Sequence, residues 1–99
     1  MASDTLRVVA RLLAKPEKVS DLRTVLSGLM EPTRAEPGCI SYELLQNKEN
    51  EVDFTFVEEW EGDSALDAHF ATDHIQQALG EFPNLLAEEL DVRRYKLVG

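Results

Sequence analysis

The chain has 99 residues, 43% of them hydrophobic, and its 10 basic and 19 acidic side chains give a net charge of −9. This length suits one core, so we expect residues 1–99 to fold as a single domain. The acidic excess would repel phosphate backbones and anionic headgroups, which argues against nucleic acid and membranes as partners. No apolar run reaches the ~18 residues that span a bilayer, and the N-terminus lacks a secretory pattern, so the sequence predicts a soluble, cytoplasmic protein.

The N-terminal third predicts a strand followed by a helix. Residues 6–13, LRVVARLL, place apolar side chains at alternate positions, as a strand with one buried face requires. Pro16 suits the first turn of a helix. From Val19 to Met30, apolar residues recur at steps of three and four, which indicates a single buried helical stripe.

The middle of the chain predicts a β-hairpin. Pro37-Gly38 is a turn signal, and the strands expected after it cover residues 39–46 and 53–60, with a polar turn between them. Side chains two residues apart share a face of a strand. We therefore expect Ile40, Tyr42 and Leu44 to share one face of the first strand, and Phe54, Phe56, Glu58 and Trp60 to share one side of the second.

The C-terminal third predicts a helix and a last strand. Asp63 or Ser64 could cap the helix, and Leu66, Phe70, Ile75 and Leu79 would mark its buried side. Thr72-Asp73 interrupts this pattern and could start a second helical segment. Gly80 is the expected end, followed by a short helical turn within residues 83–89 and a strand over residues 90–98.

The resulting order is β-α-β-β-α-β, an α+β ferredoxin-like arrangement in which two helices cover one face of an antiparallel sheet. The other face would be bare and partly apolar, which predicts a partner. Two copies joined sheet to sheet would bury it, so we expect a homodimer.

Two histidines follow the third predicted strand. His69 and His74 are five residues apart, which on one continuous helix puts them on different faces and gives no metal-site spacing. If Thr72 starts a new segment, the two could converge. They could serve as packed helix residues, or an imidazole at a cavity mouth could exchange a proton near neutral pH.

Trp60, Glu58 and Glu59 end the third predicted strand. Trp60 could be a core residue or a ligand contact. Adjacent strand residues point to opposite faces, so one of the two glutamates faces inward and would need a partner, with Arg7, Arg11, Arg93 and Arg94 as candidates. The single cysteine, Cys39, could be a nucleophile but has no local signature for that role, and a buried or turn-flanking structural role is favoured. No dinucleotide, NTP, serine-hydrolase or CxxC motif is present, so no cofactor is predicted.

Three segments together resemble the antibiotic biosynthesis monooxygenase (ABM) family, including its small quinol monooxygenase-like members. They are PGCISYELL (37–45), FTFVEEW (54–60) and DSALDAHFATDHI (63–75), which correspond to the family's Pro-Gly-Cys turn, its Glu-x-Trp strand end and its helix with His-x-x-Ser-x-His. The last motif departs from the family by carrying Thr72 in place of the serine, which keeps the spacing and the hydroxyl. The resemblance implies a dimeric α+β barrel and, for several members, oxygenation of phenols or quinols by dioxygen without metal, flavin or haem.

The resemblance also implies roles for particular residues. His69 and His74 would lie beside the pocket, Trp60 would line it, and Glu59 would match the strand glutamate. Some oxygenating relatives, and the haem-degrading ones, carry an asparagine in the first strand, and this chain has none there.

The sequence thus predicts a cofactor-free, metal-free monooxygenase for a small aromatic phenol or quinol and dioxygen. His69, His74 and Glu59 are its candidate catalytic residues, and Trp60, Tyr42 and Phe56 its candidate substrate contacts. A dimeric module that binds a small aromatic without turnover, or that acts in stress responses, is the alternative of another class. An isomerase of a small signalling metabolite is named beside that second hypothesis, and haem degradation is the third.

Overall fold

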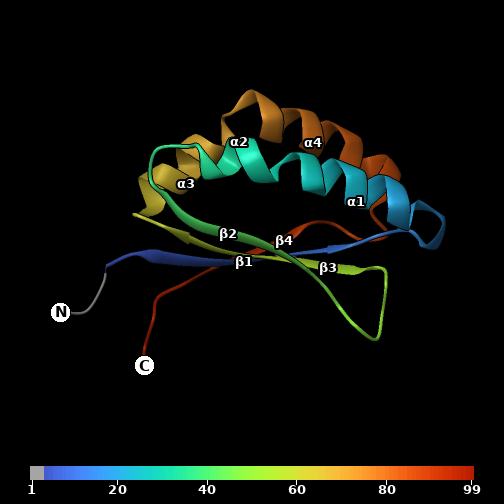
Figure 1. The fold of residues 1–99 in the computed structure, drawn as a ribbon, viewed down its shortest axis with the longest axis horizontal. Coiled ribbons are helices and arrows are strands. Elements are labelled where there is room, and N and C mark those ends of the chain that lie inside the picture. Colours follow the sequence, from blue (N-terminus) through green and yellow to red (C-terminus); the bar gives the residue numbers. More distant parts are fainter. Residues whose placement is uncertain (1–3) are drawn as a thin grey trace.

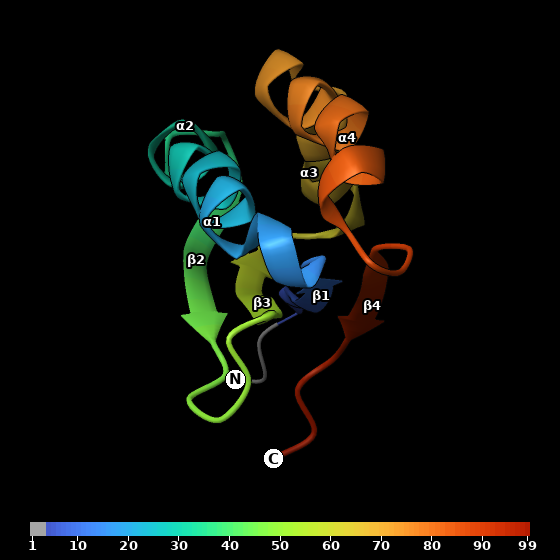
Figure 2. The ribbon, with the colours of Figure 1, turned by 90° about the vertical axis from the view of Figure 1, so that its right-hand side faces the viewer.

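The computed structural model describes residues 4–99 as a four-stranded antiparallel sheet with helices on one face (Figure 1). The strands lie in the order β2-β3-β1-β4, which Figure 2 shows end-on with the helices above the sheet and the other face open. This is the predicted α+β ferredoxin-like topology. The sheet is open in the single chain and does not close into a barrel. Within the described residues, no helix has the length and apolar character needed to cross a membrane.

The central strands follow the predicted alternation. β1 (Leu6–Leu13) pairs with β3 (Asp53–Trp60) and with β4 (Asp91–Tyr95), and buries Val8, Ala10 and Leu12 on the helix side. On the same side, β3 buries Phe54, Phe56, Glu58 and Trp60. β4 is shorter than the expected span of residues 90–98.

A β-bulge changes the expected facing in β2 (Cys39–Gln46). The register slips between Cys39, opposite Trp60, and Ser41, opposite Glu59. The extra residue in a bulge leaves the pleat. Ile40 is therefore 49% exposed, and the prediction that it shares the buried face of Tyr42 was wrong.

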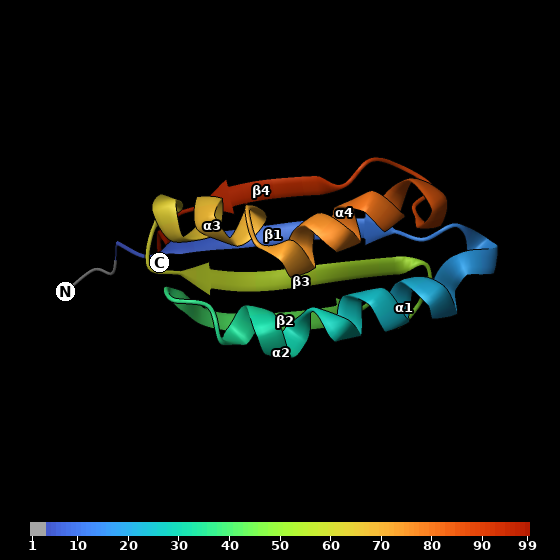
Figure 3. The same ribbon diagram turned by 90° about the horizontal axis from the view of Figure 1, so that it is seen from above.

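The helices form two pairs above the sheet. Figure 3 shows α1 (Val19–Gly28) and α2 (Met30–Arg34) over β2 and β3, and α3 (Asp63–Phe70) and α4 (Asp73–Leu85) over β1 and β4. A 3₁₀ turn, Pro16–Lys18, precedes α1. Leu22 and Leu26 of α1 are fully buried, as the apolar stripe predicted.

The second helical region differs from prediction at both ends. Neither Asp63 nor Ser64 caps α3 through its side chain. The helical region does divide at Thr72, as expected, but α4 continues through Gly80 and Pro83 to Leu85. Burial of Phe82 and Leu85 against the core outweighs the weak helix propensity of glycine and the one hydrogen bond that proline removes.

Candidate active site

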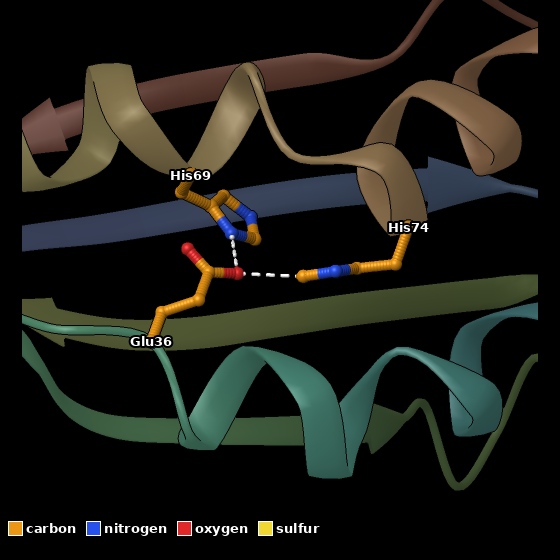
Figure 4. A group of neighbouring side chains, drawn as sticks. All are labelled: Glu36, His69 and His74. Atoms are coloured by element: carbon orange, nitrogen blue, oxygen red, sulfur yellow. Dashed lines mark hydrogen bonds and ion pairs between the residues drawn. The ribbon is translucent and has the colours of Figure 1, made fainter.

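Three side chains from separate elements meet between the helix pairs. Glu36 lies in the turn between α2 and β2, His69 in the last turn of α3, and His74 in the first turn of α4. Glu36 Oε2 is 2.8 Å from His69 Nδ1 and 2.6 Å from His74 Nε2 (Figure 4). The side chains of Glu36 and His69 are 9% and 3% exposed, and that of His74 is 25% exposed. The cluster therefore runs from the interior to the surface.

The break between α3 and α4 brings the two histidines together. Thr72 stands at the N-cap of α4, where its Oγ1 accepts from the backbone N–H of Ile75 at 3.4 Å. The same hydroxyl donates to the carbonyl of His69 at 2.7 Å. Because the chain turns at this cap, the second histidine is directed back toward the first, which a continuous helix would prevent.

A small cavity lies between the sheet and the helices on one side of His69. Its volume is about 30 Å³, enough for roughly one water molecule. Two acid–base side chains, Glu58 and His69, lie in its wall. Most of the other lining side chains are apolar. The wall also includes the half-buried side chains of Phe70 at the end of α3, Leu79 of α4, Leu90 just before β4 and Val92 of β4.

Glu58 is a buried carboxyl without a cationic partner in the described residues. Its Oε1 accepts a hydrogen bond from Trp60 Nε1 at 2.8 Å. Burial raises the pKa of Glu58 to about 7, with the indole hydrogen bond opposing the rise and the charge of Glu36 adding to it. The predicted arginine partner is wrong, because an indole N–H satisfies this carboxyl. Near neutral pH, Glu58 can either donate or accept a proton.

His69 sits among aromatic rings. Its centroid is 4.7 Å from that of Trp60 and 5.9 Å from that of Tyr42. Burial lowers the pKa of the His69 imidazole, and the hydrogen bond to Glu36 works in the opposite direction. The net lowering keeps the ring neutral near neutral pH, the state in which an imidazole can accept a proton.

The structure brings together some of the predicted site residues and separates others. Tyr42, Phe56 and His69 line the cavity, with the Tyr42 and Phe56 rings stacked at a centroid distance of 4.7 Å. Trp60 is fully buried and is not among the lining residues. Its indole N–H instead donates the hydrogen bond to the Glu58 carboxyl. His74 lies outside the cavity and reaches it only through Glu36 and His69.

Glu59 lies away from the cavity. Its Oε2 accepts from Thr5 Oγ1 at 2.7 Å and lies 3.6 Å from Arg7 Nε, on the sheet face without helices. Within one chain, it therefore cannot act at the site of His69. Because strand side chains alternate, a Glu-x-Trp spacing places Glu58 on the face of Trp60.

Sequence reasoning missed two residues of the site. Glu58 could have been found, since its shared face with Phe56 and Trp60 was already apparent from the alternation. Glu36 had no comparable signal, because it stands in a turn and is separated from His69 and His74 by 33 and 38 residues.

The Glu36–His69–His74 cluster is also a group of possible metal ligands. One ligand atom from each residue lies within 4.8 Å of the others. Ligands of one zinc ion, each ~2.0–2.2 Å from the metal, would be separated by more than 3 Å. The nitrogen–oxygen separations of 2.6 and 2.8 Å are instead those of short hydrogen bonds, and both join a ring nitrogen to the same carboxylate oxygen.

Comparison with known proteins places the chain among related sequences and structures. YcnE of Bacillus subtilis, named a "Putative monooxygenase", is 32% identical over 89% of this chain and 93% of its own. The protein sll1783 of Synechocystis is 33% identical over 97% of this chain, which spans 65% of the relative's length. The structure of Rv0793 from Mycobacterium tuberculosis superposes with a TM-score of 0.91, at 28% identity over 97% of both chains.

A family match covers most of the chain. Residues 5–81 match the family described as "Antibiotic biosynthesis monooxygenase", a range that includes β1, the β2–β3 hairpin and all three members of the Glu36–His69–His74 cluster. The shared sequence and the shared fold agree, and the chain belongs to the antibiotic biosynthesis monooxygenase family.

Proposed function

We propose that this protein is a monooxygenase that oxidises a small aromatic phenol or quinol with dioxygen and needs no metal or organic cofactor. Family membership supports the monooxygenase activity. The observation that carries the proposal is the buried, largely apolar cavity whose wall holds a neutral imidazole and a carboxyl with a pKa near 7. Such a site keeps out bulk water and still offers two groups for proton transfer.

The reaction needs nothing beyond substrate, dioxygen and these groups. His69 accepts a hydroxyl proton from the quinol, and the resulting anion is electron-rich enough to pass an electron to dioxygen. Recombination forms a carbon–oxygen bond, and protonation of the peroxide by Glu58 or the imidazolium promotes cleavage of the O–O bond. A hydroquinone and dioxygen become a hydroxyquinone and water, with all four electrons supplied by the substrate.

An aromatic substrate requires the site to open. Pockets for drug-sized ligands measure ~300–1,000 Å³, whereas this cavity is about 30 Å³. The half-buried wall residues Phe70, Leu79 and Leu90 lie at the α4–β4 side, and we propose that the ring enters there and stacks near Tyr42 and Phe56. In the closed form the space suits a molecule the size of dioxygen or water.

Oxygen uptake by the chelator-treated protein tests this function. A panel of hydroquinones and anthrone-like phenols should give uptake above autoxidation. His69→Ala should reduce it by about 10²-fold or more, the usual contribution of a general base. Glu17→Gln, an exposed change far from the cavity, is the matched control. Uptake no greater than autoxidation, or equal in wild type and His69→Ala, would contradict the proposal.

A binding module without turnover is the second candidate, favoured by the absence of an asparagine from β1, where some oxygenating relatives carry one. Such a protein would open for an aromatic ligand and close over it. Saturable quenching of Trp60 fluorescence by a panel compound, without oxygen uptake, would support this candidate over the enzyme. Trp60 is the single tryptophan, so the signal comes from beside the site.

A further inference from the structure

The short contacts of Glu36 determine which nitrogen of His69 carries a proton. A carboxylate oxygen only accepts hydrogen bonds, so the ring nitrogen facing it must be an N–H. Nδ1 of His69 faces Glu36 Oε2 at 2.8 Å, which makes Nδ1 the protonated nitrogen of the neutral ring. Nε2 then carries the free lone pair, since the side-chain hydrogen bond that the described residues give the His69 ring runs through Nδ1.

We propose that Glu36 is a positioning residue that fixes His69 in the Nδ1–H tautomer, leaving Nε2 as the base at the cavity wall, while His74 holds the Glu36 carboxylate in place. The assignment of Nε2 as a base rests on the proposed function. The tautomer and the role of Glu36 rest on the contacts alone.

The surroundings of Glu36 hold it firmly in this position. Its backbone N–H donates to the carbonyl of Thr33 at 3.0 Å, and its own carbonyl accepts from Cys39 at 3.2 Å. The second donor to Oε2 is His74 Nε2, at 2.6 Å. Two N–H donors satisfy the buried oxygen, and losing either would leave a poorly satisfied carboxylate.

The charged and titratable groups around His69 come from four elements. They are Glu36 from the α2–β2 turn, His74 from α4, Tyr42 and Cys39 from β2, and Glu58 from β3. Burial raises the pKa of both the Tyr42 hydroxyl and the Cys39 thiol, which keeps them neutral. Among these groups, Glu36 is the one whose carboxylate directly contacts the His69 ring, through Nδ1.

This arrangement gives the proton transfer a defined course. The substrate hydroxyl gives its proton to Nε2, the oxygen–hydrogen bond breaks, and His69 becomes an imidazolium. Glu36 stabilises that cation through the Nδ1–H bond without taking the proton, as the carboxylate does in a Ser-His-Asp triad. The imidazolium later returns the proton to the peroxide, which restores the resting tautomer.

Histidine ring NMR tests the tautomer directly, because His69 and His74 are the only histidines in the chain. In long-range ¹H–¹⁵N spectra, a His74→Ala variant assigns the two rings. We expect His69 to show a protonated Nδ1 and an unprotonated Nε2 in the wild type. Glu36→Gln, which removes the negative charge at nearly constant shape, should mix the tautomers, whereas the Glu17→Gln control should not.

Steady-state kinetics on a substrate found by oxygen uptake gives the second readout. Glu36→Gln should lower kcat at least tenfold and leave KM nearly unchanged, since Glu36 does not line the cavity. Even if no compound is oxidised, the ring spectra decide the tautomer assignment, so its failure is distinguishable from that of the proposed activity.

Three results would overturn the assignment. One is a wild-type His69 with its proton on Nε2. Another is a Glu36→Gln variant in which both rings are unchanged. The third is stoichiometric Zn²⁺ binding that displaces the Nδ1 proton and shifts both rings, which would make the cluster a metal centre.

Discussion

The buried carboxyl of Glu58 makes the stability of this protein depend on pH. Its pKa of about 7 in the folded chain lies above the ordinary value of 4.5, so the folded state binds more protons than the unfolded state between these values. Its contribution to stability is complete below pH 4.5 and falls as pH rises toward 7.

Glu58→Gln should remove this dependence. Glutamine does not titrate and can still accept from Trp60, so the variant should lie within about 1 kcal/mol of the wild type at pH 5 and exceed it by up to about 3 kcal/mol at pH 8. Urea unfolding at pH 5, 6, 7 and 8 measures the difference. Glu17→Gln, exposed in the 3₁₀ turn before α1 and away from the bare sheet face, is the control and should follow the wild type. A constant offset between Glu58→Gln and wild type at every pH would contradict the ionisation argument.

For single residues, the sequence predicted most of the side chains that could take part in proton transfer or ligand contact. It predicted only part of how they are arranged in space. Alternation along β3 correctly placed Phe56, Glu58 and Trp60 on one face of the sheet, because each side chain of a strand points to one of only two faces. Glu59, which was chosen from the family resemblance and not from this alternation, lies on the opposite face of β3 within the chain. The contact of Glu36 with two histidines depends on the packing of a turn against two helices, which no local pattern encodes.

The turn that carries Glu36 depends on Gly38. Gly38 has φ +86°, a conformation that favours glycine. A Cβ there would also lie 2.6 Å from Ala65 Cβ of α3. The turn and α3 are packed so closely that this position cannot hold a side chain without displacing one of them.

Gly38→Ala should therefore destabilise the protein by more than about 1 kcal/mol, from backbone strain and from the clash. Gly28→Ala, at the end of α1 with no atom within 4 Å of its added Cβ, should be neutral or slightly stabilising. Chemical denaturation of the two variants measures this contrast. If both lost the same stability, the close approach to Ala65 would not be the cause.

Elements with strong periodicity were predicted well, and their ends less so. The stripe of α1 and the alternation of β1 each repeat several times, so one exception does not change the assignment. The end of α4 is decided by a few individual residues, because burial of Phe82 and Leu85 stabilises the helix beyond Gly80. The bulge at Ile40 likewise inserts one residue that no alternation can reveal.

For the whole molecule, the order of elements was enough to predict the topology, because few arrangements satisfy β-α-β-β-α-β with short connections. The same order leaves one sheet face without helices (Figure 2). That face carries apolar side chains on three strands, including Leu45 (51% exposed), Val57 (36%) and Tyr95 (48%). We propose that a second copy of the chain covers it.

The homodimer should depend on Val57, near the middle of the bare face and paired with Val9 of β1. Val57→Glu would bring two buried carboxylates together in the interface and should convert the protein from twice the 11.1 kDa chain mass to the monomer. Light scattering after size exclusion measures this mass. Ser27→Glu, exposed on α1, adds the same charge on the helical side and should leave the dimer intact. A wild-type protein that elutes as a monomer, or a Val57→Glu variant that stays dimeric, would mean that the bare face does not join two copies.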